Sequence, residues 1–127
     1  LHSVAPRVPL WLDEGIAEYF EVADHRNQPH IEQLAGRLMQ GGWRPSLGRL
    51  ESLTAVGELE QIDYAESWAW VHWLLHTEPE RRVLLQQFLQ SIRSQAVYLP
   101  LSAAVKSGTP DAEHKLCDHL FALCSAK

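Results

Sequence analysis

The chain has 127 residues, of which 46% are hydrophobic, enough for one small globular core, so we expect a single domain over residues 1–127. Lys and Arg number 11 against 16 Asp and Glu, which gives a formal net charge of -5. The basic residues are scattered rather than clustered, and the lack of a basic footprint excludes nucleic acid as the main partner.

The sequence predicts an all-α fold, because amphipathic segments are separated by short turn-rich breaks and no convincing run alternates apolar and polar residues. We expect a compact bundle of about five to seven helices. The predicted helices run, in chain order, over about Pro9–Ala23, His30–Gln40, Ser46–Leu53, Asp63–His76, Glu80–Ser94 and Leu101–Lys106, with a last one after Thr109-Pro110. Asp63 and Thr109 are the predicted N-caps. Pro79 is expected to open the fifth helix, and Gly41-Gly42 to close the second.

The segment Asp63–His76 is apolar nearly all round, which predicts the buried central helix of the bundle. Its longest apolar run, Trp68 to Leu75, is interrupted by His72 and is far shorter than the roughly 20 residues that span a bilayer. We therefore expect no membrane-spanning helix.

The first predicted helix has an acidic side. At 100° per residue, Glu14, Glu18 and Glu21 lie opposite the apolar residues, a pattern that a solvated surface explains by itself. Gly15 in the helix interior costs about 1 kcal/mol relative to Ala, which indicates a packing or functional reason for it. Ala17 lies on the same side of the helix as Glu14, and its small side chain leaves room for another helix to come close.

The stretch Trp11-Leu12-Asp13-Glu14-Gly15-Ile16-Ala17 resembles the third-ligand helix of zinc metallopeptidases of the gluzincin class, often written Trp-Leu-x-Glu-Gly-x-Ala. Gluzincins bind zinc with two histidines of a His-Glu-x-x-His helix and one glutamate of a later helix, so the resemblance implies that Glu14 is a metal ligand. No His-Glu-x-x-His occurs in the 127 residues. The chain is therefore expected to be the C-terminal part of such a domain, inactive when alone.

A second stretch supports this resemblance. Tyr64, Ser67, Val71 and Leu74 match the Tyr-x-x-Ser-x-x-x-Val-x-x-Leu helix found downstream of the ligand glutamate in peptidase MA-like proteins, and within that set the chain resembles the DUF1570 group. Glu66 departs from the pattern, because related sequences often have a neutral polar residue there. The resemblance implies that Tyr64 and Ser67 face the cleft and that Tyr64 donates a hydrogen bond to a tetrahedral intermediate, which makes Tyr64 the candidate catalytic residue.

The function implied is that of a fragment of a zinc-dependent metallopeptidase, in which zinc-activated water hydrolyses a peptide or protein substrate in the intact protein. Zinc is the implied cofactor of the intact protein, and none is expected on this chain alone. Absence of the catalytic helix is expected to leave the face of Glu14 open and to promote self-association through it.

Two other hypotheses stay open. In the first, the chain is a non-catalytic helical interaction module or a degenerate peptidase fold, whose exposed tryptophans, Trp43 among them, bind a partner. In the second, His72 and His76 form a non-catalytic zinc site, because residues four apart share a helical face, and zinc affinity is then lost on His72→Ala. The plain alternative is one core histidine satisfied by a neighbour and one histidine near the helix C-terminus.

Overall fold

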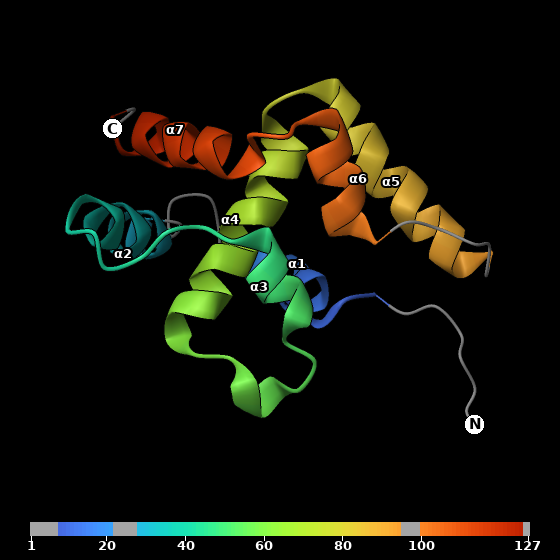
Figure 1. Ribbon diagram of the computed structural model, residues 1–127, viewed down its shortest axis with the longest axis horizontal. Coiled ribbons are helices and arrows are strands. Elements are labelled where there is room, and N and C mark those ends of the chain that lie inside the picture. The colour runs from blue at the N-terminus through green and yellow to red at the C-terminus, as the bar shows by residue number, and fades with distance from the viewer. Residues whose placement is uncertain (1–7, 22–27, 95–99, 126–127) are drawn as a thin grey trace.

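Helix α4 (Gln61–His76) runs through the middle of the structure, with α2 and α7 on one side and α5 and α6 on the other (Figure 1). The computed structural model describes residues 8–21, 28–94 and 100–125. Those residues form seven α-helices and one short 3-10 turn, and none of them lies in a strand. The prediction of an all-α bundle of five to seven helices is confirmed.

All seven predicted helices are present, with shifted ends. The observed elements are α1 (Leu10–Glu21), α2 (Gln28–Met39), α3 (Leu47–Ser52), the 3-10 turn η2 (Val56–Glu58), α4, α5 (Pro79–Arg93), α6 (Leu101–Gly108) and α7 (Ala112–Ser125). Pro79 is the first residue of α5, as predicted. Gly41 has a φ of 76° and ends α2, as the pair Gly41-Gly42 predicts. The predicted end of the first helix, residues 22 and 23, lies outside the described residues.

Both predicted N-caps are wrong. Helix α4 begins earlier than expected, so that Asp63 is its third residue and accepts a hydrogen bond from the backbone N–H of Glu60 at 2.9 Å. Thr109 ends α6 and donates its N–H to the carbonyl of Val105 at 2.8 Å. An acidic side chain satisfies free N–H groups from the third helical position as well as from the cap, so residue type alone does not separate the two positions.

Helix α4 is the buried central helix that its composition predicts. Every residue from Ala65 to Leu74 is buried. Trp68 and Trp70 have no exposed surface, and Trp73 has 1%. Because a large apolar side chain contributes roughly 1.5–3 kcal/mol when fully buried, the packing around α4 is the main source of stability.

Helix α1 crosses α4 at Gly15. A Cβ atom placed on Gly15 would lie 2.5 Å from the carbonyl oxygen of Ser67 and 2.8 Å from Cγ2 of Val71. These distances are too short for any side chain, so only glycine allows the two backbones to come this close. The prediction that Gly15 has a packing reason is confirmed.

Gly15→Ala should therefore destabilise the protein by about 1–3 kcal/mol, although alanine favours a helix by about 1 kcal/mol. Gly36→Ala is the matched control, because Gly36 is also inside a helix but has open space where its Cβ would lie. We expect this control to be neutral or slightly stabilising. Urea unfolding followed by circular dichroism measures both, and equal effects of the two substitutions would contradict the close crossing.

Candidate functional site

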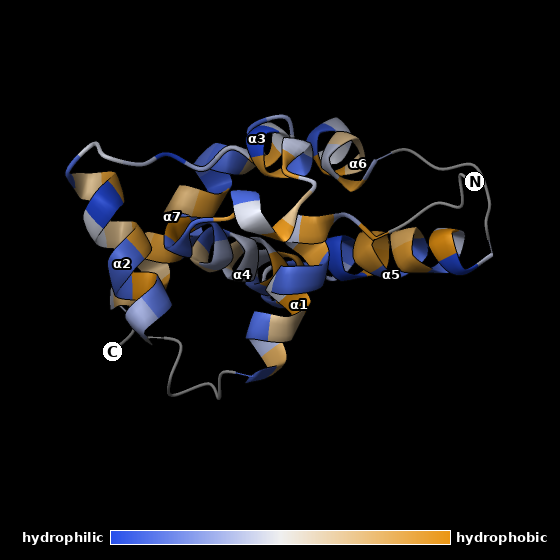
Figure 2. Ribbon diagram, turned by 90° about the horizontal axis from the view of Figure 1, so that it is seen from below, coloured by the Kyte–Doolittle hydropathy of each residue, from blue (hydrophilic) through white to orange (hydrophobic). Residues whose placement is uncertain are grey.

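Glu14, the predicted metal ligand, lies on the partly covered side of α1. Trp11, Leu12 and Gly15 are buried, whereas Glu14 is half-buried and Ala17 is exposed. In Figure 2 the C-terminal half of α1 projects away from the other helices. The carboxylate of Glu14 therefore lies at the border between the packed side of α1 and its open side.

The described residues do not form a zinc site by themselves. Within residues 8–21, 28–94 and 100–125, no three His, Cys, Asp or Glu side chains come together in a way that could hold a metal ion. Protein zinc sites use at least three such ligands, and Glu14 supplies one. Glu14 as a zinc ligand stays a prediction about a larger site.

Tyr64 and Ser67 lie near the start of α4 in different environments. Ser67 is fully buried, and its hydroxyl donates to the carbonyl of Asp63 at 2.7 Å. The expectation that Ser67 faces a cleft is therefore wrong, because its hydroxyl is used within the helix. Tyr64 is half-buried, and its catalytic role stays a prediction.

His72 and His76 do not point at a common metal ion. Their rings stack face to face, with centroids 4.2 Å apart and planes 18° apart, so their in-plane lone pairs run side by side. Nδ1 of His72 lies 2.9 Å from Nε2 of His119, and Nε2 of His76 lies 2.5 Å from the hydroxyl of Tyr19. This geometry favours the plain alternative: His72 is buried and satisfied by a neighbour, and His76 lies in the last turn of α4.

The three histidines form one cluster, here called the histidine cluster (His72, His76 and His119). Burial, together with smaller contributions from the nearby His76 and His119, lowers the pKa of His72 to about 3. Burial likewise lowers the pKa of His119 to about 4, with smaller contributions from His76 and Arg81. His72 and His119 are therefore neutral at neutral pH.

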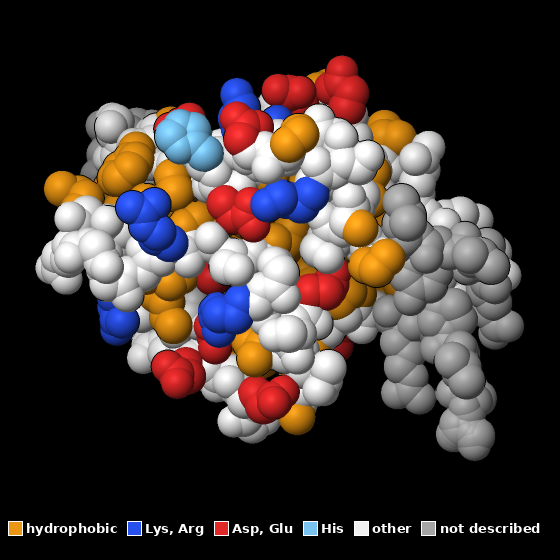
Figure 3. Space-filling model, in the orientation of Figure 1, with side chains coloured by type: hydrophobic (Ala, Val, Ile, Leu, Met, Phe, Trp, Pro, Cys, Tyr) orange, Lys and Arg blue, Asp and Glu red, His pale blue; other side chains and the backbone are white. Residues whose placement is uncertain are grey.

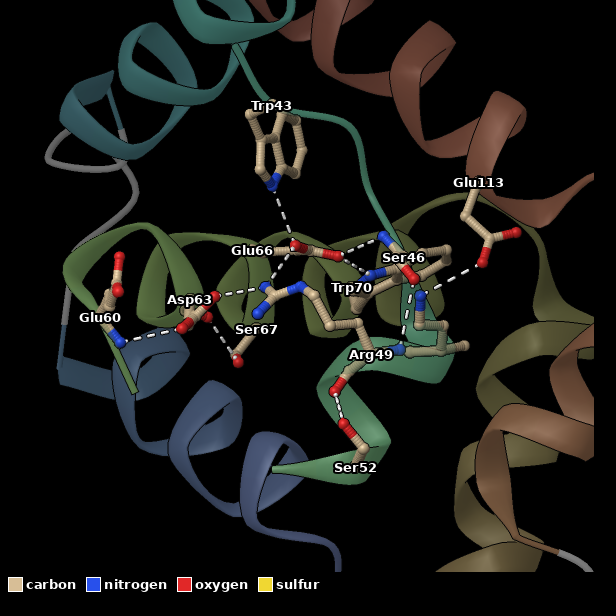
Figure 4. A network of polar contacts seen from close by, with 11 residues as sticks. Trp43, Ser46, Arg49, Ser52, Glu60, Asp63, Glu66, Ser67, Trp70 and Glu113 are labelled. Carbon is tan, nitrogen blue, oxygen red and sulfur yellow. Dashed lines mark hydrogen bonds and ion pairs between the residues drawn. The ribbon is translucent and has the colours of Figure 1, made fainter. Parts of the chain in front are cut away.

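Glu66 is a buried carboxylate at the centre of a polar network (Figure 4). It accepts hydrogen bonds from the indole N–H of Trp43 at 3.0 Å, the backbone N–H of Ser46 at 2.9 Å and the indole N–H of Trp70 at 3.1 Å. The guanidinium of Arg49 lies 3.6 Å away. Burial raises the pKa of Glu66, while these partners act in the opposite direction.

The same network fixes α3 (Figure 4). Arg49 forms an ion pair with Asp63, and Ser46 caps α3 by accepting the N–H of Arg49 at 3.2 Å. Glu113 of α7 accepts the N–H of Leu47 at 3.2 Å and pairs with Lys106 of α6. The network therefore joins α3, α4, α6 and α7, and its role is structural.

The tryptophans belong to the core rather than to an exposed surface. Trp11, Trp68, Trp70 and Trp73 are buried, and Trp43 is half-buried, packed against the core and bonded to Glu66. The expectation of exposed tryptophans, Trp43 among them, is therefore wrong, and partner binding stays a prediction without that support.

The surface has no dominant charge on the face shown in Figure 3, where Lys and Arg side chains lie among Asp and Glu. In the part of the chain that the structure describes, none of the helices is both long enough and apolar enough to cross a membrane. Comparison of the chain with protein-family models, with curated proteins and with solved structures finds no match.

Sequence reasoning missed two polar residues that organise the structure. Glu66 stands out in an otherwise apolar helix, and a charge in such a place indicates a set of buried partners. His119 carries no local signal, because the residues that give it a role lie on α4. A helical wheel of α7 alone shows only a polar position beside Leu116 and Leu120.

Glu66→Ala should destabilise the protein by about 3 kcal/mol, because one buried and two partly buried N–H groups lose their acceptor, at about 1–3 kcal/mol for a buried group. Glu66→Gln keeps one carbonyl oxygen as an acceptor and should cost less. Glu80→Ala, at an exposed position of α5, is the control and should change little. Urea unfolding at neutral pH measures all three, and a loss below about 1 kcal/mol for Glu66→Ala would contradict a structural network.

Proposed function

We propose that this chain is the glutamate-bearing helical part of a peptidase-like domain of the gluzincin class, in which Glu14 is one metal ligand. Peptide-bond hydrolysis then belongs to the complete domain, with a peptide or protein as substrate. No metal-dependent step of hydrolysis is assigned to the described residues, because Glu14 is the single metal ligand proposed among them.

One observation carries this proposal. The two stretches that resemble the family are 40 or more residues apart in the sequence, yet they pack on each other in the fold. Gly15 of the first stretch lies against the backbone of Ser67 and the side chain of Val71, which both belong to the second stretch. A chance match of two short patterns does not predict that their marked residues meet at one helix crossing.

The crossing of α1 and α4 also supports a direction in which the side chain of Glu14 points. Successive residues of a helix point about 100° apart, so fixing Gly15 against α4 turns the neighbouring Glu14 toward the side of α1. Glu14 is half-buried and Ala17 is exposed there, so a second helix has room to approach the carboxylate. Tyr64, on the turn of α4 before Ser67, remains the proposed hydrogen-bond donor to substrate.

The alternative of an interaction module has less support. Its sequence argument rests on exposed tryptophans, and the described tryptophans lie in or against the core. Phe20 of α1 is nevertheless 76% exposed, which is unusual for a large aromatic side chain and leaves an apolar group on the open part of α1.

Phe20 provides a test of the predicted self-association. We expect the chain to associate weakly with rising concentration, because a large apolar group lies on the open part of α1. Phe20→Ser should reduce this association, whereas Val83→Ser, at an exposed apolar position of α5, should not. Light scattering over a concentration series measures it, and a monomer at every concentration would contradict self-association.

The proposed function is tested by the coding sequence before Leu1 and by zinc binding. We expect a His-Glu-x-x-His within about 30 residues upstream, since ligands on packed helices must reach one ion. The protein expressed with that segment should hold one zinc per chain. Glu14→Gln should weaken zinc binding by more than the roughly 10- to 100-fold typical of residues that only support a ligand.

Glu21→Gln is the matched control, because Glu21 is an exposed carboxylate on the same helix. It should leave zinc affinity unchanged. Metal content by mass spectrometry and competition with a chelator measure both variants. An upstream segment without the motif, or equal zinc affinity of Glu14→Gln and the unsubstituted protein, would overturn the proposal.

A further inference from the structure

The histidine cluster connects three helices that are distant in the sequence. His72 and His76 belong to α4, and His119 belongs to α7. The Tyr19 hydroxyl of α1 bonds to His76, and the Tyr19 ring lies edge-on to His72 with centroids 6.2 Å apart. The cluster therefore links α1 and α7 through the last turns of α4.

The contacts in this cluster do not survive protonation of all its rings. In the pair formed by Nδ1 of His72 and Nε2 of His119, one nitrogen donates and the other accepts. When one of the two rings takes up a proton, one of these nitrogens still donates and the other still accepts. When both rings are protonated, both nitrogens are donors and the hydrogen bond is lost. His76 stacks on His72 at 4.2 Å, so positive charge on both rings is repulsive.

The surrounding charges offer little compensation for an added proton. Arg81 of α5 contributes positive charge that disfavours protonation of His119. On α1, Glu18 lies 3.0 Å from Nε2 of His30 on α2 and is used by that pair. On α7, Asp118 lies 3.8 Å from the exposed His114.

We propose that the histidine cluster is an acid-sensitive clasp, which holds α1 and α7 on α4 while its rings are neutral and releases them when the rings take up protons. This device is independent of the proposed peptidase function, because it rests on contacts among Tyr19, His72, His76 and His119 alone.

The pH range of release follows from the two lowered pKa values. His72 and His119 have a pKa of about 3 and about 4 in the folded protein, against 6.5 for an ordinary histidine. A released ring thus binds protons that the packed ring does not, and the packed state loses stability as the pH falls below about 6.5. Each ring raises the opening equilibrium constant by up to about tenfold per pH unit in this range. The stabilisation is fully present above that pH.

Amide hydrogen exchange between pH 7 and pH 4.5 tests the clasp, after correction for the intrinsic pH dependence of exchange. We expect opening constants of α1 and α7 to rise steeply with acid, and those of α6, whose main contacts are with α5 and α3, to rise less. His119→Gln removes one titrating ring but keeps a hydrogen-bonding side chain, so the slope in log units should fall by about half. His114→Gln is the control, because His114 is an exposed histidine of the same helix, and it should keep the full slope.

A second measurement uses the unsubstituted protein and does not depend on any variant folding. Nuclear magnetic resonance titration of the imidazole signals should show His72 and His119 still neutral at pH 5.5 in the folded state. Titration of both rings near pH 6.5 without loss of the fold would overturn the clasp, and so would an unchanged slope in a folded His119→Gln protein.

Discussion

The structure depends on the burial of α4 on all sides. A helix that has no solvent-exposed face over Ala65 to Leu74 places its polar side chains inside the protein, and α4 carries Glu66 in its first half and His72 in its second. Burying such groups without hydrogen-bond partners costs several kcal/mol. The segments packed around α4 supply these partners. The segment between α2 and α3 provides donors for Glu66, and α7 provides His119 for His72. The arrangement of the outer helices thus follows from the polar requirements of the central one as well as from its apolar surface.

The two polar sites solve the burial problem in different ways. Glu66 is surrounded by N–H donors and an arginine, and the burial that raises its pKa is opposed by each of these partners. His72 lies against the imidazoles of His76 and His119 and the indole of Trp68. Its hydrogen bond goes to the neutral ring of His119, so the uncharged form of His72 is the one that fits. The Glu66 network is consequently a fixed structural contact. The histidine cluster, in the proposed clasp, loses its contacts as the pH falls below about 6.5.

The sequence was informative wherever a local rule decides the structure. Pro79 and Gly41 act through their own backbone preferences, so the start of α5 and the end of α2 could be predicted from residue type. The predictions of Asp63 and Thr109 as N-caps were wrong, because several positions at a helix end suit the same side chains. Phe20 shares the apolar side of α1 but is 76% exposed, whereas its neighbour Tyr19 packs against the core. The exposure of Phe20 depends on which parts of α1 the other helices cover, and the sequence of α1 does not contain that information. The partners of His119 and Glu66 could not be predicted, because they depend on which helices meet.

Helix α1 is held on α4 by two contacts of different character, and this difference bears on both proposals. At Gly15 the backbones touch with no side chain between them, a contact that protons do not alter. At Tyr19 the contact runs through His76 and His72, the two α4 rings of the proposed acid-sensitive clasp. Glu14 lies next to the first contact and five residues before the second along the same helix. Release of the Tyr19 end would therefore free the C-terminal half of α1 first, while Gly15 keeps Glu14 near its position on α4. Under the proposed function, the carboxylate of Glu14 meets metal ligands from another helix, and its place beside the contact that is insensitive to pH would keep it in position for them.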